Sequence, residues 1–151
     1  MNTVPEFYRS YIECTNDTSF MEQLNQSTNQ ISLIMDSINE QTAVFGDLED
    51  KWSFKEIFPH IIDCKCIFSY RALHLYRGEK QILLSFDQDE YLIRGEASLR
   101  DVKSSKREFL SVRESTILMF SFFSGKQWQL KGKICFHELT VNILEYITVV
   151  T

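Results

Sequence analysis

The chain has 151 residues, a formal net charge of −5 and a hydrophobic share of 44%, and its 12 phenylalanines supply much of the apolar bulk. This length fits a single domain, 1–151, with enough apolar material for a packed core. The net negative charge argues against a nucleic-acid-binding surface, because neutralising phosphates requires a basic face. The sequence shows neither a signal-peptide pattern nor an apolar run of about 20 residues, so we expect a cytoplasmic protein without membrane contact.

The first long helix is predicted over 20–38, where apolar residues recur at steps of three, four and seven. Ser19 and Glu22 form a capping box at its start, in which each side chain can satisfy a free backbone N–H. A shorter helix, 5–12, is predicted to precede it.

The strongest helical pattern covers 54–77 and carries apolar residues on more than one face, which predicts a central helix. Ser53 and Glu56 form a second capping box, and Gly78 stands where a C-terminal cap belongs. Pro59 falls in the second turn and removes one backbone hydrogen bond, so we expect a bend there.

The second half of the chain predicts one long helix and one short one. A solvated loop is predicted over 86–91, anchored by its two aromatic ends. Ser98 with Asp101 is expected to open the third helix, and Gly125 to close it.

A loop over 126–138 and a short apolar helix over 141–150 are predicted to complete the fold. Three long helices and a short fourth predict an all-α, up-down four-helix bundle with a shortened fourth helix.

The four cysteines are expected to be reduced, as is usual in the cytoplasm, and to serve as small buried hydrophobes. They are Cys14, Cys64, Cys66 and Cys135. The middle pair forms C-x-C, which differs from the C-x-x-C of redox and zinc motifs.

His60 is the candidate metal ligand, although a lone histidine on an apolar helix face is more often a satisfied core residue. His74 cannot share a metal with it, because 14 positions correspond to about 21 Å along a helix. His137 has no second histidine at metal-binding spacing and is interpreted as a loop residue. Asp63 and Cys64, three and four positions after His60, are close enough to share a partial site.

The residues around His60 resemble the DinB-like superfamily. The resemblance rests on K-W-S-F-K-E-I at 51–57, His60 itself and F-S-Y-R-A-L at 68–73, with V-R-E-S-T at 112–116 and L-E-Y-I at 144–147 as weaker matches. It implies a four-helix bundle, often a homodimer, and a divalent metal such as zinc or nickel held by three histidines. Family members include thiol-dependent S-transferases, metal-dependent hydrolases and DNA-damage-inducible proteins.

By this resemblance His60 matches the metal histidine of the second helix, whereas the other two come from a G-H-E-x-H-H motif in the fourth. Aligned on the family, Thr151 falls at the first of them, so the rest of the motif is missing here. The first hypothesis is therefore an incomplete metal site without bound metal, and a binding or assembly role. The alternative is an active metal-dependent transferase or hydrolase that completes its site with Asp63, Cys64 or a partner chain.

A homodimer is expected under either hypothesis, because a short fourth helix leaves core for a partner to cover. Whether the protein is an enzyme, which substrate it takes and whether it uses a thiol cofactor stay open.

Overall fold

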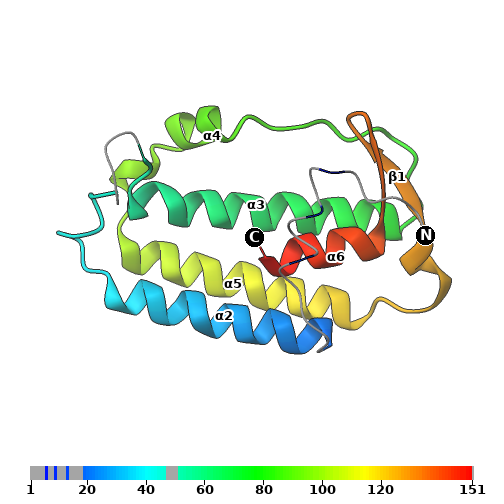
Figure 1. Ribbon diagram of the computed structural model, residues 1–151, viewed down its shortest axis with the longest axis horizontal. Helices are drawn as coiled ribbons and strands as arrows, with labels where there is room; N and C mark the ends of the chain where they lie inside the picture. The colour runs from blue at the N-terminus through cyan, green and yellow to red at the C-terminus, as the bar shows by residue number, and fades with distance from the viewer. Residues whose placement is uncertain (1–5, 7–8, 10–12, 14–18, 47–50, 151) are drawn as a thin grey trace.

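The protein is described by a computed structural model for residues 6, 9, 13, 19–46 and 51–150, and Figure 1 shows its arrangement. The elements are α2 (Phe20–Ser37), α3 (Phe54–Tyr76), α4 (Gln88–Arg94), the 3-10 turn η1 (Ala97–Leu99), α5 (Val102–Ser121), the 3-10 turn η2 (Gly125–Gln129), β1 (Lys131–Ile134), β2 (His137–Thr140) and α6 (Val141–Val150). The helix predicted over 5–12 falls largely outside the described residues. No helix in the described ranges is both long and apolar enough to cross a membrane.

The predicted four-helix bundle is confirmed, and it is formed by α2, α3, α5 and α6. The helices do not simply alternate in direction: α3 and α5 run one way, and α2 and α6 run the other (Figure 1). The parallel pair exists because the segment after α3, which contains α4, returns along the outside of α3 before α5 begins. Within the 151-residue sequence α6 has 10 residues, against 23 in α3.

The helix starts follow from local capping, as predicted. The Ser19 N–H donates to the Glu22 carboxylate at 3.0 Å, and the Glu22 N–H donates to the Ser19 hydroxyl at 3.3 Å. At α3 the Ser53 N–H donates to the Glu56 carboxylate at 2.8 Å. Gly78 follows the last turn of α3 with φ +78, a left-handed conformation that favours glycine and fits its predicted role at the helix end.

The boundaries of α5 differ from the prediction. Asp101 alone caps the helix by accepting from the Ser104 N–H at 2.8 Å, while Ser98 lies in the 3-10 turn before it. At the other end α5 stops at Ser121, and Gly125 opens η2 instead of closing the helix. The two short 3-10 turns thus take residues that the sequence pattern assigned to α5.

The stretch predicted as a loop over 86–91 is partly helical, which corrects the prediction. Asp87 caps α4 by accepting from two backbone N–H groups, and Glu90 pairs with Arg94 at 2.8 Å, one turn further on. The anchors Phe86 and Tyr91 are in ring contact at 5.2 Å. A capping Asp followed three positions later by Glu was the sequence signal for this short helix.

The predicted loop over 126–138 was also wrong, because most of it forms η2 and an antiparallel hairpin. The register pairs Lys131 with Thr140, Gly132 with Leu139, Lys133 with Glu138 and Ile134 with His137. Leu83 from the return segment joins the hairpin edge, donating to the Lys133 carbonyl at 3.0 Å and accepting from the Cys135 N–H at 2.8 Å. Gly132 lets β1 approach α3, since a Cβ there would lie 2.7 Å from Leu75 Cδ1.

The buried apolar residues form two clusters, one toward each end of the bundle. The cluster near the hairpin contains Cys64, Phe68, Ala72, Leu75, Leu83, Phe120, Phe123, Ile134, Leu139, Val141, Ile143, Leu144 and Ile147. The other contains Met35, Ala43, Phe58, Ile62, Val102 and Phe109. Residues of α6 belong only to the first cluster, so the half of the bundle around the start of α3 is packed by α2, α3 and α5.

Candidate metal site around His60

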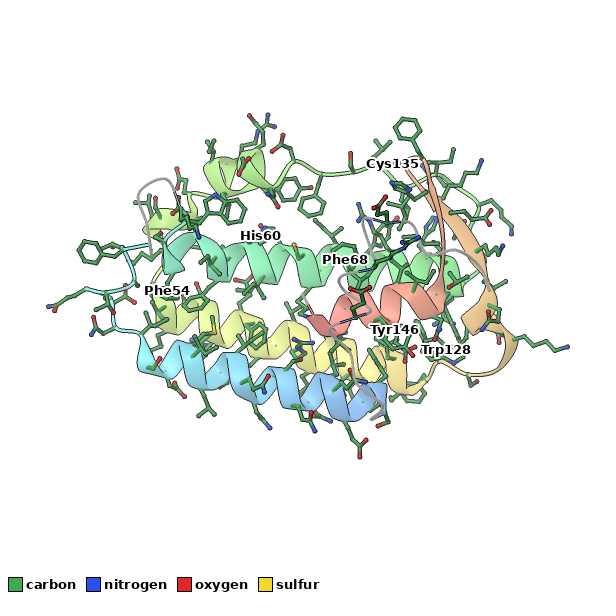
Figure 2. The ribbon with its side chains drawn as sticks, viewed as in Figure 1. Phe54, His60, Phe68, Trp128, Cys135 and Tyr146 are labelled. Carbon is green, nitrogen blue, oxygen red and sulfur yellow. The ribbon has the colours of Figure 1, made fainter. Side chains whose placement is uncertain are left out.

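His60 lies in the second turn of α3, toward the end of the bundle away from the hairpin (Figure 2). The helix continues through the buried Pro59 just before it. The imidazole is half-buried, and this burial lowers the pKa of His60 below its usual value. The carboxylates of Asp63 and Asp89 oppose that effect in part. His60 is therefore held mainly as the neutral imidazole at neutral pH.

Trp52 covers one side of the imidazole, with ring centroids 4.9 Å apart in an edge-to-face arrangement. Trp52 also lines a small, mostly apolar cleft of about 210 Å³ at the start of α3. The other lining residues are Phe45, Gly46, Lys51, Phe54 and Ile57. The cleft is below the volume of most small-molecule sites, and His60 itself does not line it.

Cys64 stands one helical turn after His60, with its sulfur 3.5 Å from Nε2 and 3.8 Å from Nδ1. Burial is the main cause that raises the pKa of the Cys64 thiol to about 11, and the charge of Asp63 adds to it. The thiol and the imidazole are therefore both neutral near pH 7. A neutral pair of this kind lacks the thiolate that nucleophilic catalysis requires.

Asp63 is half-buried beside His60, and burial raises the pKa of its carboxyl group. The positive charge of Arg100, and that of His60 when the imidazole is protonated, act against that rise. The carboxylate thus contributes charge to the surroundings of the imidazole.

The i, i+4 placement of His60 and Cys64 on one helix face is one that two metal ligands can use. The side chains as they stand are not in ligand geometry, because the sulfur is 3.5 Å from Nε2 and 3.8 Å from Nδ1 and therefore lies off the lone-pair axis of either nitrogen. A complete site needs more ligands. In the part of the chain that the structure describes, no group of three or more His, Cys, Asp and Glu side chains could hold a metal ion.

The other histidines lie elsewhere in the fold. His74 is buried near the end of α3, where its Nε2 lies 3.2 Å from the Gln81 carbonyl oxygen. His137 is exposed in strand β2 and not in a loop, which corrects that part of the prediction. Neither histidine is placed to share a metal with His60, as the sequence spacing predicted.

The cysteines follow the prediction only in part. Cys64 is buried, whereas Cys66 is exposed and Cys135 is half-buried at the tip of the hairpin. These three are free thiols. Cys14 lies outside the described residues. Cys66 is exposed because it lies on the face of α3 that is turned to solvent.

No family model matches the sequence, and no curated protein matches it. Among solved structures the chain is similar to YfiT from Bacillus subtilis, described as "a probable metal-dependent hydrolase with an unusual four-helix bundle topology". The alignment has a TM-score of 0.79 and covers 99% of this chain and 82% of YfiT. The chain has a YfiT-like fold. The sequence identity to YfiT is 8%, so this likeness concerns the arrangement of the helices.

His60 is expected to titrate below the ordinary histidine pKa of 6.5, because burial disfavours the imidazolium ion. The unfolded chain then takes up the proton more readily than the folded one. The stabilising contribution of neutral His60 is therefore complete above about pH 6.5 and is lost as the pH falls below it. A carbon–proton NMR titration, with the imidazole signal assigned by its loss in His60→Gln, measures this pKa. A midpoint above 6.5 would contradict the expectation.

Proposed function

We propose that this chain is a YfiT-like four-helix-bundle protein with a binding or assembly role, built around a metal centre that it does not complete by itself. The observation that carries the proposal is the state of the His60–Cys64 pair. The two groups are 3.5 Å apart and neutral, and a third ligand is missing from the described residues around them. Two ligands on one helix contribute too little to hold a divalent metal against water.

The chemistry of the pair also argues against metal-free catalysis at this position. A catalytic Cys–His pair works as thiolate and imidazolium, or with an imidazole that can accept the thiol proton during attack. Here burial raises the pKa of Cys64 and lowers the pKa of His60, so both shifts oppose that proton transfer. The site is therefore better suited to binding than to nucleophilic attack.

A second candidate function is an active metal-dependent transferase or hydrolase, and the i, i+4 placement of His60 and Cys64 on α3 favours it. The missing ligands would then come from a partner chain. A bound divalent metal would supply an activated water or a Lewis acid. In this case His60 and Cys64 would serve to hold and orient the ion.

Metal analysis separates the two candidates. The protein purified without added metal is analysed for bound metals, and Co²⁺ is then titrated in to detect the absorption of a cobalt–thiolate bond. The variants are His60→Ala and Cys64→Ala, with Cys66→Ala as the matched control because that thiol is exposed on the same helix. The first proposal expects metal-free protein and no cobalt–thiolate band. Stoichiometric metal that both test variants lose and the control keeps would overturn it in favour of the second.

The homodimer expected from the sequence stays a prediction. Sedimentation velocity at several protein concentrations tests it, and a mass that remains that of one chain at tens of micromolar would contradict it. The same measurement on the cobalt-loaded protein shows whether metal and association are linked, as a shared site between two chains would require.

A further inference from the structure

Two buried basic side chains meet at the last turn of α6. Lys65 of α3 is 0% exposed and Arg113 of α5 is 1% exposed. Both donate to the carbonyl oxygen of Thr148: Lys65 through Nζ, and Arg113 through Nη1 at 3.3 Å. α6 packs against α2 and α3, so Arg113 reaches Thr148 across the interior of the bundle.

The positive charge at this point is only partly balanced. The ion pairs of the described residues all lie elsewhere, and none includes Lys65 or Arg113. Burial and the neighbouring Arg113 lower the pKa of Lys65 well below its usual value, whereas burial lowers the pKa of Arg113 only to about 10, so Arg113 keeps its charge near pH 7. The C-terminal end of a helix carries about half a negative charge, which the Thr148 carbonyl brings to the guanidinium. This leaves part of the Arg113 charge unbalanced in a buried place, where an unpaired ion is costly.

One edge of the Arg113 guanidinium lacks a hydrogen-bond partner. Nε and Nη2 are buried and have no hydrogen-bond partner, whereas Nη1 donates to the Thr148 carbonyl oxygen. In a guanidinium, the Nε–H points away from Cδ toward the Nη2 side, so the two free nitrogens form one bidentate edge. That edge matches the spacing of two oxygens in a carboxylate or phosphate. The ring of Phe109 lies 5.4 Å from the guanidinium carbon and helps to fix its plane.

We propose that the free Nε–Nη2 edge of Arg113 binds the two oxygens of a small oxyanion, a carboxylate or a phosphate, inside the bundle beside the end of α6. The bound anion would satisfy both unpartnered N–H groups and supply the missing negative charge. It would also avoid repulsion by the Thr148 carbonyl, which occupies the other side of the guanidinium. The burial of Arg113 restricts the ligand to a small molecule that enters through local opening of the bundle.

This inference goes beyond the proposed function, because none of its atoms belongs to the His60–Cys64 pair. The site could hold its anion whether or not His60 binds metal. The sequence analysis did not single out Lys65 or Arg113, whose burial is seen only in the folded structure.

The test is anion binding to the full chain at pH 7 and constant ionic strength, with sodium acetate, sodium phosphate and sodium chloride as the three probes. We expect acetate or phosphate to shift the Nε–Hε signal of Arg113 in ¹⁵N NMR with a saturable curve, and to raise the thermal unfolding midpoint over the same concentrations. The acetate and phosphate arms distinguish the two oxyanions. Chloride should shift the signal less than either oxyanion, since it cannot place a separate acceptor oxygen on each N–H group.

The variants make the result specific to the guanidinium. Arg113→Met should abolish the dependence of the unfolding midpoint on the oxyanion. Arg113→Lys keeps the positive charge but loses the two parallel N–H donors of the guanidinium, so it should weaken binding by about tenfold or more. Arg107→Met is the matched control, since Arg107 is exposed on the same helix. The proposal is overturned if neither oxyanion acts on the wild-type protein, if chloride acts equally, or if Arg113→Lys binds as well as the wild type.

Discussion

Replacing Phe109 with alanine is expected to lower the free energy of unfolding by about 3–5 kcal/mol, the usual cost of a large cavity in a packed core. Phe109 is 0% exposed and belongs to the core cluster that α2, α3 and α5 share at the end of the bundle away from the hairpin. Because no residue of α6 belongs to that cluster, few neighbours can move in to fill the space. The Arg113 guanidinium would also lose the ring that lies 5.4 Å away.

Urea unfolding followed by circular dichroism measures this change, and Leu110→Ala is the matched control. Leu110 is the next residue on α5 but is 38% exposed, so its truncation is expected to cost less than about 1 kcal/mol. Similar losses for the two variants would show that the packing around Phe109 is not as described.

Glu145 on α6 is expected to make the protein less stable as the pH rises from about 4.5 through about 7. The side chain is buried, and burial raises the pKa of its carboxyl group from 4.5 to about 7. The folded protein therefore keeps the proton in a range where the unfolded chain releases it, so stability is highest below the unfolded pKa and declines toward the folded one. The loss should be on the order of 2 kcal/mol, after allowance for partial solvent screening.

Glu145→Gln, which stays uncharged, should remove this loss. The variant is expected to match the wild type near pH 5 and to be more stable near pH 8, as measured by urea unfolding at unit steps of pH. Glu114→Gln on the exposed face of α5 is the control. Since His60 acts in the opposite direction over part of this range, the informative quantity is the difference between wild type and variant at each pH. A constant difference from pH 5 to pH 8 would refute the expectation.

The candidate site was partly predictable, because helical spacing relates residues that are close in sequence. The choice of His60, and Cys64 one turn after it, follows from the i, i+4 geometry of a helix. The contact with Trp52 does not follow, since that residue precedes the helix cap and its direction depends on how the chain enters α3. The neutral state of the pair also depends on burial, which the sequence pattern does not measure.

The fold, like the site, was predictable only where the signals are local in the sequence. Capping boxes and apolar stripes determined the start of α2 and α3 and the existence of four bundle helices, because each signal acts within one or two turns of the chain. The hairpin was missed because its two-residue turn, Cys135–Phe136, lacks the Gly or Asn that usually signals such a turn, although Cys135 has φ +53. The parallel direction of α3 and α5 depends on a long return segment whose path no local signal sets.

Capping boxes and apolar periodicity in the sequence were thus enough to predict a four-helix bundle and to single out His60. Only the tertiary structure decided that His60 meets Cys64 as a neutral pair, and that Lys65 and Arg113 are buried against the end of α6. The physical reason is the range of the forces involved. Caps and helical periodicity are set by neighbours along the chain, whereas burial, and with it charge state and unmet hydrogen bonds, is set by helices that meet only after folding.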